Sequence, residues 1–311
     1  EPMARRIVTD LELDLGAFMR KNTGLNYGAR GTAVDAWGDV AGAGAMMDAA
    51  GVPMADEKYY LMNPFTTTAL SSAQNGLNAS DGLVRTAWEK AQISSNFGGM
   101  RALTSNALSS YTSGSTTDRS GDLKVAPDAT YLAAKDTMQQ TMVIETLGAG
   151  TIVAGDQIQI ANVNKLNIAT REVMLDATGA AVPWTGTVLE TVTIAGNEAT
   201  VIVSGAAIYE ANGQYNTVDA APAAGAVVTI LGAAGAIYQP NLFYTQQAFG
   251  LGTVKLPKLY STDTIATTSD GMSIRVSKYA DGDANTQKIR FDLLPAYATF
   301  NPLFCGKGFG V

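Results

Sequence analysis

The middle of the chain, from residue 141 to residue 231, is a series of short strand-like segments, and this stretch constrains the fold most strongly. The segments are TMVIETL (141–147), DQIQIANV (156–163), REVMLD (171–176), TVLETVTI (187–194), EATVIVS (198–204) and AVVTIL (226–231). Each is short, contains β-branched residues and is bounded by turn signals such as Ala-Gly-Asn at 195–197. Short strands with this regular punctuation predict a β-barrel or a β-sandwich.

Within these segments apolar residues alternate with polar or small ones, as in strands with one buried face. The sequence therefore predicts an interior formed by Ile158, Ile160, Val173, Leu175, Val192, Ile194, Val201, Val203, Val228 and Ile230. A closed barrel leaves no free edge, so such a unit can fold between two halves of another domain.

The segments before the strands are mainly helical. The opening stretch, EPMARRIVTDLELDLGAFMRKN, predicts an amphipathic helix over residues 1–22 that starts with Pro2 at the favoured first position. Its apolar residues follow at spacings of four, four and three: Ile7, Leu11, Leu15 and Phe18. Because this helix begins without any lead-in, we expect the 311 residues to be part of a longer polypeptide.

Two further helices are predicted before residue 100. The first spans residues 34–50 and ends at Gly-Val-Pro; its apolar side consists of Trp37, Val40, Ala41 and Met47. The second spans residues 81–92, is capped by Asp81 and has an apolar side consisting of Leu83, Ala87, Trp88 and Ala91.

Three other segments complete the prediction. KYYLMNP (58–64) is typical of a short buried strand closed by Asn-Pro, and the polar stretch 109–122 is typical of an exposed loop or linker. Residues 272–294 predict two strands joined by an Asp/Gly/Asn turn. The strand-rich middle thus interrupts a mixed pattern, which predicts an α+β protein with host segments 1–147 and 233–311 and an inserted all-β domain at 148–232.

Composition excludes several classes of function. Net charge is −7 and the pI is about 4.7, so the chain has no overall positive field to hold nucleic acid. No apolar run reaches the length of a membrane span. Only 16% of residues are charged, which favours a chain that buries surface against partners. The absence of histidine removes the Ser-His-Asp and Cys-His systems.

Two groups of carboxylates could carry chemistry. Asp10, Glu12 and Asp14 share the first helix, but residues two apart on a helix point about 200° away from each other, so we interpret them as a solvated or intersubunit face rather than a catalytic pair. The other group has the approximate spacing of a calcium loop and comprises Asp281, Asp283, Asn285 and Asp292. Thr286 stands where that loop needs Gly, and an ordinary hairpin turn is the simpler interpretation.

The late hairpin also carries four cations, Arg275, Lys278, Lys288 and Arg290. In an acidic protein they could contact acidic surfaces of a neighbouring subunit, or they could be ordinary exposed hairpin charges. Cys305, the single cysteine, stands near Lys307, which could lower a thiol pKa. Without any histidine in the chain, a buried structural thiol is the interpretation we adopt.

The order of these features resembles the major coat proteins of short-tailed phages of the P-22 type. The resemblance rests on the helix opening at Glu-Pro, the helix ending in Gly-Val-Pro, the FGG segment, AGDQIQIANVN (154–164), ANGQYNTVDAAPAAGAVVTILG (211–232) and IRFDLLPAYATFNP (289–302). It covers nearly the whole chain. It implies a Hong Kong 97-type capsid fold with axial and peripheral domains and an inserted β-barrel, in which residues 1–22 form the spine helix.

The resemblance also implies the function. The chain would be a major capsid subunit, not an enzyme, that assembles with copies of itself into hexamers and pentamers of an icosahedral head around double-stranded DNA. Scaffolding and portal proteins would be partners during assembly in the host bacterial cytoplasm, and a cementing protein is a further partner. DNA would lie nearby without specific binding, no membrane would be involved and no cofactor is implied. The N-terminal arm and extended loop that precede the spine helix in this family are absent from the sequence.

A secreted carbohydrate-binding or carbohydrate-active protein is the alternative from another class. The acidic composition and the Thr/Ser/Gly-rich strands favour it. Against it, Trp37 and Trp88 are predicted on apolar helix faces, which leaves few aromatic platforms for sugars.

Overall fold

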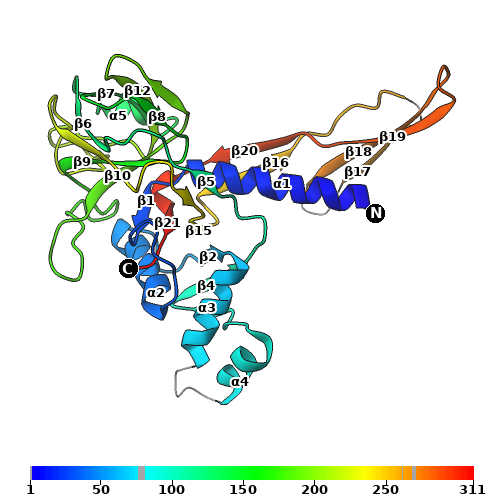
Figure 1. The fold of residues 1–311 in the computed structure, drawn as a ribbon, viewed down its shortest axis with the longest axis horizontal. Coiled ribbons are helices and arrows are strands. Elements are labelled where there is room, and N and C mark those ends of the chain that lie inside the picture. The colour runs from blue at the N-terminus through cyan, green and yellow to red at the C-terminus, as the bar shows by residue number, and fades with distance from the viewer. Residues whose placement is uncertain (1, 76–80, 261, 268–270) are drawn as a thin grey trace.

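The computed structural model describes residues 2–75, 81–260, 262–267 and 271–311 (Figure 1). The protein is α+β, with a mixed sheet and its helices at one end, a closed barrel beside them, and a long arm that points away from both (Figure 1). None of the described helices is long and apolar enough to cross a membrane.

The host sheet has the strand order β1-β21-β15-β2-β4-β3. Its strands are β1 (Leu25–Tyr27), β21 (Cys305–Gly308), β15 (Asn241–Thr245), β2 (Lys58–Met62), β4 (Met100–Thr104) and β3 (Asn96–Phe97). The predicted strand at KYYLMNP is thus confirmed as β2. Strands from both ends of the chain meet in this sheet, because β1 pairs in parallel with β21.

Helix α2 (Trp37–Ala50) supplies the apolar layer of the host core. Val40 and Met47 are buried as predicted, whereas Trp37, in the first turn, is 55% exposed and was wrongly placed on the apolar side. The helix ends because Gly51 adopts the left-handed conformation at φ 94°, where side chains other than glycine are strained.

Helix α3 (Pro64–Asn75) was not predicted. Asn-Pro was interpreted only as the end of a strand, but it also starts a helix: the Asn63 Oδ1 accepts the Thr66 backbone N–H at 2.7 Å, and Pro64 fits the first turn. Helix α4 (Asp81–Lys90) follows; Ala87 is buried, Ala91 is exposed beyond the helix end, and the side chains of Asp81, Leu83 and Trp88 lie outside the described residues.

The barrel closes in the order β10-β12-β7-β6-β13-β9. Its strands are β6 (Ser120–Leu123), β7 (Gln139–Glu145), β9 (Gln157–Asn164), β10 (Pro183–Val188), β12 (Ala199–Ser204) and β13 (Val227–Ile230). Short accessory elements are β5 (Tyr111–Thr112), β14 (Ile237–Tyr238), β8 (Gly150–Ile152), β11 (Val192–Ile194) and α5 (Tyr131–Ala134). Two barrel strands, β6 and β7, precede the predicted boundary at residue 148, so the barrel begins earlier than the sequence pattern indicated.

Most of the predicted barrel interior is buried. Ile158, Ile160, Ile194, Val201, Val203, Val228 and Ile230 belong to one core, and Val192 packs against it. The prediction was wrong for Val173 and Leu175, which are 37% and 59% exposed. REVMLD forms only isolated bridges, because residues 165–182 leave the barrel and contact the end of α2, where the Ile168 N–H donates to the Ala50 carbonyl at 3.0 Å.

The segment 109–122 was predicted as an exposed loop, and the structure corrects this. It contains β5 and the start of β6, and Ser113 and Thr116 are buried. Its polar groups have internal partners: the Ser113 hydroxyl donates to Asp156 Oδ1 at 2.7 Å and the Gly114 N–H to Asp156 Oδ2 at 2.9 Å. Internal hydrogen bonds allow such a polar sequence to be buried.

The arm, as we name residues 249–299, runs away from the sheet and the barrel (Figure 1). It consists of the ribbon β16 (Phe249–Thr253) and β20 (Pro295–Thr299), and of the three-stranded sheet β17 (Thr264–Thr267), β18 (Ser273–Asp281) and β19 (Thr286–Asp292). The predicted late hairpin is confirmed as β18 and β19, and the 3₁₀ turn η1 (Pro302–Phe304) leads back to the sheet. Helix α1 (Pro2–Lys21), also predicted, lies along the arm and stacks Phe18 on Tyr297 with 5.5 Å between ring centroids (Figure 1).

Candidate assembly surfaces

Among the described residues of the arm, no hydrophobic core cluster is found. Along β19 the residues from Thr286 to Arg290 are all exposed, without the alternation of a strand that covers a core. Large apolar side chains are exposed along its length: Leu251, Val254, Leu259, Tyr260, Ile289 and Leu294. A thin sheet with apolar residues facing solvent is typical of a surface that another molecule covers.

Arg275 does not belong to this exposed surface. Its guanidinium is bound inside the arm, with Nε 2.9 Å and Nη2 2.5 Å from Asp292 Oδ2, and Nη1 2.7 Å from the Pro257 carbonyl oxygen. Arg275 is 7% exposed, so its contact with a neighbouring subunit stays a prediction that this internal pairing disfavours. The sequence could not show that the cross-strand partner of Arg275 is an acid.

Two of the other three hairpin cations are also paired internally. The Lys288 amine lies 2.9 Å from Asp281 Oδ2, and Arg290 Nε lies 2.8 Å from Asp292 Oδ1. The hydrogen bond from Lys288 lowers the pKa of the Asp281 carboxyl below its ordinary value. Lys278 is exposed, and no ion pair of this residue is seen in the described part of the chain, so it is the hairpin cation best placed to meet a partner.

The candidate calcium loop is a hairpin turn. Asp281 pairs with Thr286 beside the turn, whereas Asp292 pairs with Arg275 at the other end of the hairpin, so the carboxylates do not converge. Asn285 occupies the left-handed turn position at φ 48°. The described residues contain no cluster of three or more acidic, cysteine or histidine side chains that could hold a metal ion.

The carboxylates of α1 are exposed, as predicted. Asp10 forms a 3.0 Å ion pair with Arg6 one turn earlier. Asp10 and Asp14, one turn apart, line a hollow of about 220 Å³ between α1 and the arm, together with Ile7, Leu11, Phe291, Leu293 and Pro295. Glu12 does not line this hollow, in agreement with the expected divergence of residues two apart.

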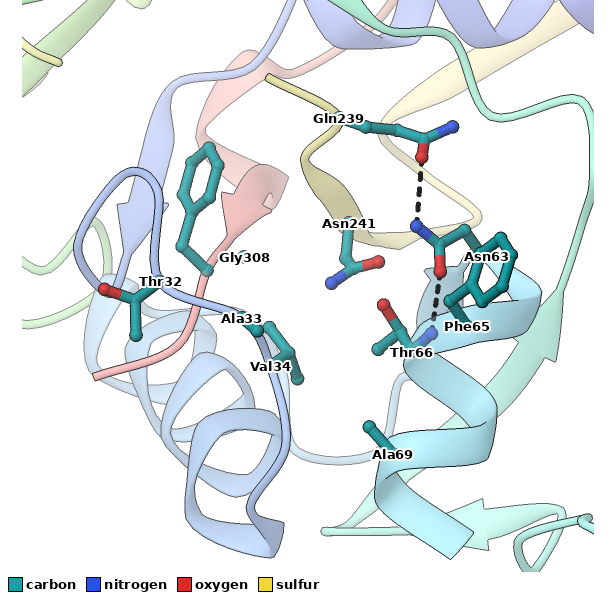
Figure 2. A pocket seen from close by; sticks show the side chains of 11 residues that line it. Thr32, Ala33, Val34, Asn63, Phe65, Thr66, Ala69, Gln239, Asn241 and Gly308 are labelled. Atoms are coloured by element: carbon teal, nitrogen blue, oxygen red, sulfur yellow. Dashed lines mark hydrogen bonds between the residues drawn. The ribbon is translucent and has the colours of Figure 1, made fainter. Parts of the chain in front are cut away.

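A second hollow, of about 270 Å³, lies between the loop at 32–34 and the start of α3 (Figure 2). Figure 2 shows the Asn63 amide donating to Gln239 Oε1, at 3.0 Å, and the Thr66 N–H donating to Asn63. The described residues that line this hollow are all neutral, so they offer hydrogen bonds and apolar contacts but no acid or base. This hollow was not predicted, because it depends on the start of α3, which the sequence pattern did not indicate.

Cys305 is buried, as expected of a structural thiol. Its Sγ donates to the carbonyl oxygens of Asn22 and Pro302, each at 3.3 Å. Burial raises the pKa of the thiol well above its ordinary value, so it stays protonated at neutral pH.

These surfaces are those of a subunit in a larger assembly. Comparison with known proteins shows which assembly: residues 1–310 match the family described as "P22 coat protein - gene protein 5". The major capsid protein of Acyrthosiphon pisum secondary endosymbiont phage 1 is 46% identical over 316 residues, which cover 99% of this chain and 74% of that protein. The chain belongs to this coat protein family and is a structural capsid subunit of a tailed phage. Neither comparison supports the carbohydrate alternative.

Proposed function

We propose that this chain builds an icosahedral phage head by repeated contacts between arms and helices of neighbouring copies. The capsid would consist of hexamers and pentamers around double-stranded DNA, and the fold would be of the Hong Kong 97 type, with α1 as its spine helix. The observation that carries this proposal is the arm, which is exposed on both sides along β19 and lies beside α1.

Strand β19 is exposed on both faces from Thr286 to Arg290, so little packing stabilises this part of the arm in water. Exposed apolar residues gain free energy from being covered. Ile289 is 51% exposed and Leu259 is 56% exposed. A neighbouring subunit would bury such side chains, and many equal contacts in a closed shell would add up to collective stability.

Exposed charged side chains of the arm and of α1 are the candidates for charged contacts between subunits. We propose Lys278 on one subunit and the α1 carboxylates Asp10, Glu12 and Asp14 on another as contact residues. Lys288 and Arg290, although paired internally, are partly exposed and could add to this surface.

We further propose that the barrel is an inserted domain covering residues 120–230, within a host made of residues 1–112 and 237–311. This division follows the closed barrel order and replaces the boundary at residue 148. The host would form the axial and peripheral parts of the capsid subunit.

The wider setting is also a proposal. The subunit would act without catalysis or a cofactor, would assemble in the host bacterial cytoplasm with scaffolding and portal proteins, and would accept a cementing protein on the finished shell. DNA would be enclosed without specific binding, since the chain has a net charge of −7.

The test is a charge placed on the arm. Ile289→Lys should abolish shell formation, as measured by sedimentation, while circular dichroism shows an unchanged fold, because Ile289 is 51% exposed and belongs to no core cluster of the described residues. Leu132→Lys makes the same kind of change on the barrel, where Leu132 is 72% exposed, and should still give shells. Normal shells from the Ile289→Lys subunit would show that the arm is not an assembly surface.

A further inference from the structure

The barrel and the host meet where the chain leaves α1. Three consecutive backbone carbonyls at residues 23–25 of the host each accept a hydrogen bond from a barrel side chain. The pairs are Thr187 to Thr23 at 2.5 Å, Thr185 to Gly24 at 3.1 Å and Gln157 to Leu25 at 3.2 Å. The barrel therefore contacts the chain directly after the C-terminal end of α1, the helix that lies along the arm.

Two buried lysines cross this junction in opposite directions. Lys165, the residue directly after barrel strand β9, donates to the host carbonyl of Gly24 and lies 3.5 Å from the Thr185 carbonyl oxygen. Lys307, in host strand β21, donates to the barrel carbonyl of Gly155 at 2.6 Å. Lys165 is 4% exposed and Lys307 is 0% exposed.

The Lys165 amine has carbonyl acceptors but no acidic partner among the described residues. The titratable group that acts on it is the Cys305 thiol, which is itself uncharged near neutral pH because burial raises its pKa. Burying an ammonium without a counter-ion is costly, so the neutral amine is favoured. Burial lowers the pKa of Lys165 to about 7.

The surroundings of Lys307 carry more charge. Arg20 and Arg30 face it from the host, Asp156 faces it from the barrel, Cys305 lies on its own strand, and the ring of Tyr111 is centred 5.5 Å from its amine. The Asp156 carboxylate already accepts hydrogen bonds from Ser113, Gly114 and Val153 and lies 4.0 Å from Arg119. Burial first, and then the two arginines, lower the pKa of Lys307 well below its ordinary value.

We propose that this junction is a pH-dependent lock, in which two neutral lysine amines hold the barrel against the end of α1 and proton uptake releases it. An opened junction exposes both amines to water, where they bind protons at the ordinary lysine pKa of about 10.4. The closed junction binds fewer protons than the open one, so closure becomes more favourable as pH rises.

The pH window follows from the two lysines. The contribution of Lys165 to closure of the junction is complete above about pH 10.4 and is lost as pH falls toward 7. Below that pH the amine is charged in both the closed and the open junction. The contribution of Lys307 continues to fall below pH 7, since the pKa of this amine is lowered well below its ordinary value. The lock lies within one chain, so it does not depend on how subunits assemble.

Hydrogen exchange of the full, unassembled subunit tests the lock. Protection of the backbone amides at residues 22–25 and 155–158 is measured between pH 7 and 9, after correction for the intrinsic exchange rate. We expect protection to rise by about tenfold per pH unit for each lysine that binds a proton on opening. Protection that does not change with pH in the unmodified subunit would overturn the proposal.

Three variants separate the lock from simple packing. Lys165→Met removes one titrating amine, so the rise of amide protection with pH should become about tenfold smaller per pH unit. Lys165→Arg stays charged and should give weak protection with the same reduced pH dependence. Lys124→Met, at an exposed barrel lysine paired with Glu198, is the control and should keep the full slope. If Lys165→Met does not fold, Lys307→Met provides the same test, and a full slope in either folded variant would contradict the lock.

Discussion

Arg275 on β18 and Asp292 on β19 face each other across the late hairpin, and the guanidinium donates twice to one carboxylate oxygen, from Nε at 2.9 Å and from Nη2 at 2.5 Å. The Arg275 side chain is 8% exposed, and its Nη1 donates to the Pro257 carbonyl oxygen at 2.7 Å. The pair therefore fastens the base of the hairpin to the segment before β17. Its role is to hold the arm in shape, so that other residues can form the outer contacts.

Removing this guanidinium should loosen the arm without unfolding the rest of the chain. Arg275→Gln leaves Asp292 without its buried partner, and losing a hydrogen bond to a charged group costs about 1.5–3 kcal/mol. Hydrogen exchange should show faster opening of β18 and β19 while the barrel stays protected. Arg290→Gln is the matched change at a half-exposed cation and should cost less stability than Arg275→Gln.

The barrel should fold by itself only if all six strands are included. Residues 115–236, expressed alone, contain β6 and β7 and should give a cooperatively melting β monomer by circular dichroism. Residues 146–234 lack both strands, so the barrel cannot close and the fragment should be disordered or aggregated. Equal stability of the two fragments would mean that β6 and β7 are not needed for the barrel.

A charge in the barrel interior should prevent folding of the whole subunit. Ile160 is buried in the barrel core, and Ile160→Asp places an unpaired carboxylate there, at a cost of several kcal/mol. We expect aggregated subunits that form no shells. Leu175→Asp makes the same change at an exposed residue of the 165–182 excursion and should yield soluble protein with a nearly unchanged melting temperature.

Salt should not dissolve the shell. Three of the four hairpin cations are already paired within the arm, so contacts between subunits should depend mainly on apolar side chains. At about 1 M salt, where the screening length is about 3 Å, shells should remain intact in sedimentation experiments. Release of free subunits at that salt concentration would show that charge pairs dominate the lattice.

The sequence predicted those elements whose pattern is local. The spacing of Ile7, Leu11, Leu15 and Phe18 sufficed for α1, and alternation sufficed for most of the barrel interior. Val173 and Leu175 alternate in the same way, but their segment leaves the barrel to contact α2, which only tertiary structure determines. Polar burial around Asp156 was missed for the same reason, since its partners are distant in the sequence.

The candidate contact residues, too, were predictable only where local geometry determines them. The divergence of Glu12 from Asp10 and Asp14 on α1 follows from helical geometry and was predictable. The internal pairing of Arg275 depends on strand register, which places Asp292 opposite it. The positions of four cations along a hairpin sequence do not determine that register.

A cryo-electron microscopy reconstruction of the particle formed by the coat subunit would show whether the arm and α1 form its intersubunit contacts. We predict an icosahedral shell of pentamers and hexamers in which residues 249–299 and α1 of each subunit contact neighbouring copies, with Ile289 and Lys278 covered. A shell in which both faces of the arm remain open to solvent, or an assembly without icosahedral order, would contradict the account.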